Sequence, residues 1–285
     1  MNEVGIGRFV VAGRTAGGAW YVGYRVSSRS FPNRKIVTRA DRAMVVPTAD
    51  AAPTDNPYIS YNCLRTCEGA IVVANGSHVD PIIEKIRAAF TACNAARDLT
   101  LNRSRELIRY CSLTIRAVHR EEFDEAAQLL ETAKQAAAAM KADIKPHPEL
   151  YYTGYTQDSL KELTEACVVY AIVRGQPLPA PADIDVDEAA YLNGLAEAAS
   201  ELRRRCLDLI RRDRVAEAER MLTAMDDIYA QLVTIDFPDA LTGGLRRTTD
   251  ALRAVLERTR GDVTTTLQQE KLQKALNQVM SHVVK

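Results

Sequence analysis

The chain changes character near residue 90, and this change separates two parts that must fold differently. Eight of its 14 glycines lie in residues 1–90, and only six lie in the remaining 195 residues. Before the change, short segments rich in valine, isoleucine and aromatic residues are punctuated by glycine or proline, as is typical of strands and turns. After it, apolar residues recur every three or four positions, which is the period of an amphipathic helix. The sequence therefore predicts an α+β segment over 1–90 and an all-α domain over 91–285.

The pattern in each part predicts individual elements. We expect one helix at Asp80–Phe90, because a proline near its start precedes regularly spaced isoleucines. In the second part, clusters of proline and glycine interrupt the pattern at 145–148, 175–185, 237–238 and 243–244, which predicts six or seven helices. Residues 263–284 form either a last helix or a frayed tail. The expected strands are Arg8–Ala12, Trp20–Val26, Ala43–Val46 and Ala70–Asn75.

Composition excludes several classes of protein. Lysine plus arginine and aspartate plus glutamate number 37 each, so any nucleic-acid site must come from local clustering of charge. Apolar runs are too short to cross a membrane, and the amino-terminal residues lack the pattern of a secretory signal. We therefore expect a cytoplasmic protein without a membrane partner. The six cysteines are scattered, which favours free thiols in a core over a zinc site.

A loop in the first part concentrates groups that bind phosphate. The string RVSSRSFPNR (Arg25–Arg34) places three arginines and three serines directly after an expected strand. Guanidinium groups and hydroxyls suit a phosphate, although a solvated polar turn is the alternative from composition alone.

Together with NPYISYNC (Asn56–Cys63) and NGSHVDP (Asn75–Pro81), this string resembles the archaeal-type IMP cyclohydrolase family. The resemblance implies a partial fold like that of N-terminal-nucleophile hydrolases. It also implies a purine nucleotide site, in which Arg25, Arg29 and Arg34 hold phosphate or carboxamide and Tyr61 and Asn62 lie at the closing ring. The resemblance stops after the first expected helix, so we expect an incomplete cyclohydrolase domain.

Acidic residues in the helical part form a stripe. Asp158, Glu162 and Glu165 are spaced four and three residues apart, which places them on one helix face about 60° wide. Like charges this close are unfavourable unless they are solvated, paired with arginine or bridged by a divalent cation. Asp226 and Asp227 offer further oxygen ligands from another helix, and ligation by oxygen alone favours magnesium or manganese over zinc.

Four arginines form a second stripe on the helix expected at 102–120. Their directions fall within about 60° of one another, so they share one face that matches a phosphate backbone. The alternative is ion pairing with nearby surface glutamates. The four are Arg105, Arg109, Arg116 and Arg120.

The helical part resembles the translin family, and in particular its branch of translin-associated factor X. The motifs that carry the resemblance are SRELIR (Ser104–Arg109), IRAVHR (Ile115–Arg120), LYYTGY (Leu150–Tyr155), LKELTEA (Leu160–Ala166) and YLNGLAEAASEL (Tyr191–Leu202). The resemblance implies an all-α helical bundle of translin type that assembles into a closed homo-oligomer, typically an octamer. It also implies RNA binding inside the shell.

In this branch the resemblance further implies a metal-dependent acidic site that cleaves RNA. It assigns Glu162, Glu165 and Asp227 as ligands of Mg²⁺ or Mn²⁺, with Glu201 as a fourth catalytic acid. The leading hypothesis is therefore a metal-dependent endoribonuclease acting on single-stranded or short duplex RNA. One alternative is an IMP cyclohydrolase whose helical half serves oligomerisation. The other is a non-catalytic protein that binds RNA or single-stranded nucleic acid.

Overall fold

A computed structural model of the 285-residue chain describes residues 9–26, 32–53, 59–76 and 78–283. Two compact units divide after Ala95, within the long helix α1, and each is described by itself. No helix in these ranges combines the length and apolar character that a membrane crossing requires. The strands are β1 (Phe9–Arg14), β2 (Trp20–Arg25), β3 (Arg34–Thr38), β4 (Arg42–Pro47), β5 (Tyr61–Cys67) and β6 (Ala70–Val73). The helices are α1 (Val79–His119), α2 (Phe123–Asp143), α3 (Gly154–Arg174), α4 (Pro181–Ile184), α5 (Glu188–Ile210), α6 (Val215–Leu232), α7 (Asp239–Thr242) and α8 (Leu245–Val283).

The first unit is a small antiparallel sheet region. Strands β1 and β2 pair with each other, and β3, β4, β5 and β6 form a four-stranded sheet in sequence order. A small core in this unit contains Val45, Tyr61 and Cys63, which are all buried. The prediction of a sheet-forming segment is thus confirmed, but the sequence pattern missed β3 and β5.

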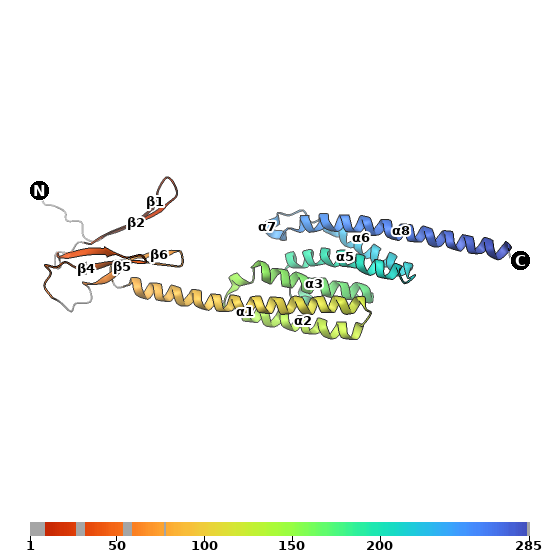
Figure 1. Cartoon of the computed structure of the whole chain (residues 1–285), viewed down its shortest axis with the longest axis horizontal. Coiled ribbons are helices and arrows are strands. Elements are labelled where there is room, and N and C mark those ends of the chain that lie inside the picture. Colours follow the sequence, from red (N-terminus) through yellow and green to blue (C-terminus); the bar gives the residue numbers. More distant parts are fainter. Residues whose placement is uncertain (1–8, 27–31, 54–58, 77, 284–285) are drawn as a thin grey trace. The chain divides into compact units, whose positions relative to one another are not determined.

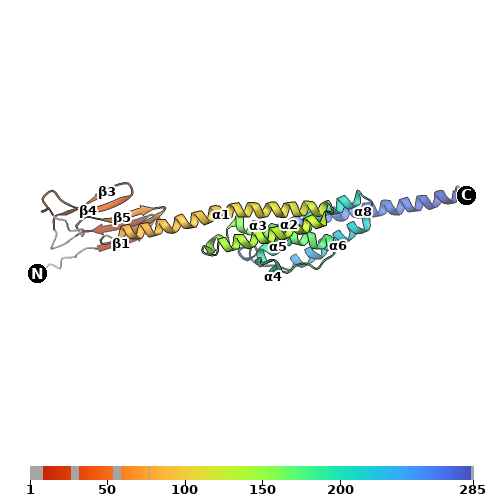
Figure 2. The same cartoon turned by 90° about the horizontal axis from the view of Figure 1, so that it is seen from below.

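The second unit is a helical bundle in which α5 has a central place (Figure 1). Helix α5 packs along α3 on one side and along α6 and α8 on another, and the same neighbours are visible in Figure 2. Three clusters of buried apolar side chains fill the bundle, with Leu163 of α3, Leu202 of α5 and Leu256 of α8 among their fully buried members. The prediction of an all-α second part is confirmed.

Helix ends fall where the sequence predicted breaks. Helix α3 ends at Arg174, and the next residue, Gly175, has a φ of 67°, in the left-handed region that glycine adopts without strain. Residues 263–283 continue α8 as a helix, which settles the alternative of a frayed tail. All six cysteines are free thiols, and five of them are buried. The prediction that they are packed thiols is therefore confirmed.

Candidate functional site

Three carboxylates from two helices converge at one point of the bundle. Glu162 and Glu165 lie one turn apart on α3, and Glu197 faces them from α5. One oxygen from each side chain lies within 4.8 Å of the others, and all three residues are half-buried. This spacing is short enough for one small cation to contact all three.

The close packing of α3 and α5 explains how the three carboxylates meet. Gly194 of α5 lies directly against α3, where an added Cβ would be 2.5 Å from the Lys161 carbonyl oxygen and 2.6 Å from Thr164 Cβ. No side chain fits in that space, because real Cβ contacts are longer. Glycine at this position therefore permits the approach that brings Glu197 within reach of Glu162 and Glu165.

The electrostatics of the cluster indicate an incompletely neutralised site. Burial, followed by the charges of Glu162, Glu197 and Glu201, raises the pKa of Glu165 to about 8. Burial and the charge of Glu197 also raise the pKa of Glu162. A group of carboxylates with raised pKa values gains strongly from an added positive charge.

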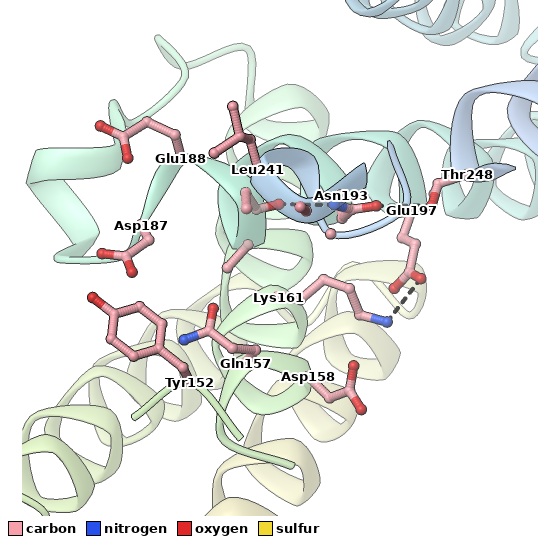
Figure 3. Close-up of a pocket in the computed structure, with 14 residues that line it drawn as sticks. Tyr152, Gln157, Asp158, Lys161, Asp187, Glu188, Asn193, Glu197, Leu241 and Thr248 are labelled. Carbon is pink, nitrogen blue, oxygen red and sulfur yellow. Dashed lines mark hydrogen bonds and ion pairs between the residues drawn. The ribbon is translucent and has the colours of Figure 1, made fainter. Parts of the chain in front are cut away.

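One cation of the chain already lies beside the cluster. Lys161 Nζ is 2.9 Å from Glu197 Oε1 (Figure 3). Burial opposes the charge of this lysine, but its hydrogen bond to Glu197 and the neighbouring carboxylates raise its pKa overall. One ammonium group against several carboxylates leaves the cluster with a net negative charge. The oxygen-only donor set and this charge both fit Mg²⁺ or Mn²⁺.

The structure places Asp227, the predicted third ligand, apart from this cluster. Asp227 is exposed on α6 and does not belong to the group of convergent oxygens. The reason is the packing order of the helices, since it is α5 that covers the acidic face of α3. Glu197 is the carboxylate that the structure brings together with Glu162 and Glu165. The sequence could have pointed to Glu197, because this residue lies four positions before Glu201 and therefore on the same face of one helix.

Glu201 lies next to this cluster and is held by a buried histidine. His119 Nε2 is 2.7 Å from Glu201 Oε1, and the histidine is only 4 % exposed. The charge of Glu201 contributes to the raised pKa of Glu165, so the two carboxylates lie close in space. Glu201 is nevertheless outside the group whose oxygens lie within 4.8 Å of one another. Its position fits a neighbour of the site better than a ligand.

The four arginines of the predicted stripe are all exposed. Arg120 is paired with Glu122 and Glu125. Arg105, Arg109 and Arg116 form no ion pair with any residue in the described ranges. The alternative of surface ion pairing thus applies to one member of the stripe, and three guanidinium groups remain available for anions.

The residues predicted to bind a nucleotide in the first unit have different surroundings. Tyr61 and Asn62 are buried on β5, where the hydroxyl oxygens of Tyr61 and Tyr24 are 2.7 Å apart. Asn62 Nδ2 donates to both carboxylate oxygens of Asp80, each at 2.8 Å. Arg25 is exposed at the end of β2, and Arg34 begins β3. Arg29 lies outside the described residues.

The helical unit is similar to solved structures of C3PO. In the structure titled "Structure of AfC3PO - duplex RNA complex", a chain is 33% identical over 65% of this chain and 96% of that chain, with a TM-score of 0.62. An uncharacterized protein of Methanocaldococcus jannaschii is 32% identical over 188 residues, which are 65% of this chain and 83% of that protein. The chain belongs to the translin family. A translin-like fold is also seen in apo-NeC3PO, at 18% identity and a TM-score of 0.60, with 65% of this chain and 97% of that chain covered.

This translin-family chain carries a second similarity in its first unit. Residues 5–105 match the family described as IMP cyclohydrolase-like protein. IMP cyclohydrolase from Halobacterium salinarum is 54% identical over 96 residues, which are 34% of this chain and 47% of that enzyme. The enzyme from Haloquadratum walsbyi is 50% identical over the same shares of the two chains. The chain therefore spans about half the length of the curated cyclohydrolases that it matches.

Proposed function

We propose that the chain is an RNA-binding endoribonuclease that depends on Mg²⁺ or Mn²⁺ and acts as a closed oligomer, such as an octamer. The observation that carries this proposal is the group formed by Glu162, Glu165 and Glu197, in which three oxygens lie within 4.8 Å of one another. The similarity to a C3PO whose structure is that of a complex with duplex RNA supports RNA as the ligand. Single-stranded RNA and short duplexes are the substrates to test.

The roles of the side chains follow from their positions. Glu162, Glu165 and Glu197 would hold the cation, which when bound would activate water and stabilise charge on the phosphoryl oxygens. Glu201, held by His119, keeps a further negative charge beside Glu165. The exposed arginines of α1 would contact phosphates of the RNA, which fixes its position without reading its sequence.

The most direct test is binding of manganese, followed by the electron paramagnetic resonance signal of the free ion. Glu197→Gln is expected to weaken binding at least about tenfold, since metal sites already lose this much when supporting residues outside the ligand set are changed. Asp227→Asn is the matched control and should bind as the wild type does. Affinity should also rise with pH up to about 8, because the proton on Glu165 must leave before its carboxylate can bind. Equal affinity of all three proteins would contradict the assignment of Glu197.

The arginine stripe makes a separate prediction about RNA binding. Arg109→Ala or Arg116→Ala should lower RNA affinity for every sequence and reduce the slope of log Kd against log salt by about one. Arg120→Ala should have a smaller effect, because its ion pairs with Glu122 and Glu125 already occupy the guanidinium group. Filter binding over a series of salt concentrations measures all three variants. Unchanged slopes for Arg109→Ala and Arg116→Ala would remove the stripe from the RNA site.

IMP cyclohydrolase activity is a second candidate function, favoured by the match over residues 5–105. Ring closure requires the amine and the formyl carbon to be held together. Because the chain spans about half of these relatives, we predict that it forms no IMP from the formylated nucleotide above the rate without protein. A chromatographic assay of the full chain tests this. Measurable ring closure that is lost in Arg34→Ala would overturn the prediction and support a purine nucleotide site.

If neither RNA cleavage nor ring closure is observed, the third hypothesis remains, a non-catalytic shell that binds RNA or single-stranded nucleic acid. Incubation of the full chain with labelled RNA and with the formylated nucleotide, each with and without Mg²⁺, separates the three functions.

A further inference from the structure

The first unit exposes apolar side chains on both faces of its strands. Three pairs of consecutive residues on β1, β2 and β3 are exposed, namely Val10 and Val11, Trp20 and Tyr21, and Ile36 and Val37. Successive side chains of a strand point to opposite faces of the sheet. Neither face of these strands is therefore fully covered at these positions. An antiparallel sheet usually packs at least one face on a core, so part of the expected cover is missing.

The same strands have open edges. Strands β1 and β2 form a ribbon of their own, and β3 and β6 are the outer strands of the four-stranded sheet, within the described part of the chain (Figure 1). A two-stranded ribbon alone is marginally stable, and an open edge pairs readily with another chain. Trp20 on β2 is 72% exposed, the largest exposed fraction among the large apolar side chains described in this unit. An apolar surface with open edges is typical of a site that another polypeptide covers.

The half of the cyclohydrolase fold that this chain lacks would account for the uncovered surface. The match covers 47% of the Halobacterium salinarum enzyme. IMP cyclohydrolase from Methanocella arvoryzae is 49% identical over 86 residues, which are 30% of this chain and 42% of that enzyme. Beyond residue 105, where the family match ends, helix α1 continues into the translin-like unit instead. The unmatched part of these enzymes is a natural cover for the exposed strands, because domains bury each apolar layer against another.

Polar groups inside the first unit also lack partners. Asn62 Nδ2 and Arg65 Nη1 both donate to the Asp80 carboxylate, so the two side chains are fixed. Asn62 Oδ1 and Arg65 Nε are nevertheless buried without a hydrogen-bond partner among the described residues. Buried polar atoms in folded proteins nearly always have one. These two atoms are therefore positioned for groups that this half of the fold does not supply.

We propose that the first unit is a docking surface for a separate polypeptide that carries the other half of the cyclohydrolase fold. This partner would pair with the open edges, cover Trp20 and its apolar neighbours, and complete the surroundings of Asn62 and Arg65. A second copy of this chain fits less well, because it brings the same strands again and none of the missing ones. The inference is independent of the proposed ribonuclease function, since it concerns the first unit alone.

The test uses the full chain and the part of the Methanocella arvoryzae enzyme that the match leaves out. The two polypeptides are coexpressed and purified through a tag on the full chain. The unmatched part should copurify. The matched segment of the same enzyme, which duplicates the first unit, is the control and should not. Given the formylated nucleotide, the purified pair should form IMP, whereas the full chain alone is predicted to form none.

Substitutions on the exposed strands locate the contact. Trp20→Ser should raise the Kd for the dye-labelled partner at least about 30-fold, as is typical for loss of an aromatic hot spot. Ile71→Ser on β6 tests the other sheet independently and should raise Kd at least about fivefold. Phe237→Ser, which removes an exposed aromatic ring in the second unit, is the matched control and should bind as the wild type does. Fluorescence anisotropy gives the three Kd values, and circular dichroism checks that each variant is folded.

Trp20 is the single tryptophan of the chain, so its emission reports whether the ribbon is covered. Binding of a partner whose own tryptophans are replaced by phenylalanine should shift this emission to shorter wavelength. Failure to copurify would overturn the proposal, and so would equal Kd values for the wild type, Trp20→Ser and Ile71→Ser. A shift that follows the concentration of the full chain alone would also overturn it, because the surface would then join copies of this chain.

Discussion

Glu165→Gln is expected to reduce Mg²⁺-dependent RNA cleavage by the full chain at least about 100-fold, the upper range for loss of a residue that merely supports a metal ligand. Glutamine keeps the shape of the side chain but removes the negative charge that binds a cation. In the unliganded protein the pKa of Glu165 is raised to about 8 by burial and by its acidic neighbours, so the variant should fold normally. Cleavage of labelled RNA under single-turnover conditions measures the effect.

RNA binding provides the control for this experiment. Glu165→Gln should bind RNA with nearly wild-type affinity, because the exposed arginines of α1 are untouched. Asp227→Asn, which changes an exposed acid on α6, should cleave at the normal rate. Near-normal cleavage by both Glu165→Gln and Glu197→Gln would show that the acidic cluster is not the catalytic site.

Glu121→Ala is expected to lower the free energy of unfolding by about 3 kcal/mol, since it leaves a buried charge without its partner. Glu121 lies between α1 and α2, and it accepts a hydrogen bond of 2.6 Å from Arg205 of α5. The Arg205 side chain is only 4% exposed. Arg214 also pairs with Glu121, and the hydrogen bond from Arg205 is the main cause of the lowered pKa of this carboxylate.

Denaturant unfolding measures the free energy of unfolding of Glu121→Ala, and Glu122→Ala, a change at the neighbouring residue, is the control. Glu122 pairs with the exposed Arg120, so its loss should cost less than about 1 kcal/mol. Alanine and glutamate have similar preferences at the backbone φ of 65° found at residue 121. The difference between the variants therefore reports the buried ion pair. Equal stabilities would show that water or Glu217 replaces Glu121 as the partner.

The sequence predicted the helical unit well because its breaks have local causes. Proline and glycine at 145–148, 175–185, 237–238 and 243–244 interrupt any helix, and α2, α3 and α7 end just before three of these positions. Helix α6 already ends at Leu232, ahead of the break at 237–238. The opposite case is α1, which was expected as separate helices at 80–90 and 102–120. Residues 91–101 contain neither glycine nor proline, so the helix continues through them without interruption.

Features that depend on tertiary packing were harder to predict from the sequence. Strand β3 (Arg34–Thr38) is short and begins with two basic residues, so it lacks a clear alternation and forms through its pairing with β4. The acidic stripe of α3 was visible in the sequence, since Glu162 and Glu165 share one face. Which helix covers that face is decided by the order of packing, and local spacing on α6 gave no information about it. The sequence consequently pointed to Asp227, whereas the structure brings Glu197 close to Glu162 and Glu165.

The contact at Gly194 has a consequence for how metal content would be read in solution. At this contact the main chains of α3 and α5 lie against each other, so folding itself brings the carboxylates together. They therefore repel one another before any ion binds. A cation that relieves this repulsion binds the folded protein in preference to the unfolded chain, where the three acids lie far apart. Binding of that kind raises the melting temperature in proportion to the logarithm of ion concentration above Kd. The melting temperature would thus report how much of the acidic site is occupied by metal, in an assay that contains no nucleic acid.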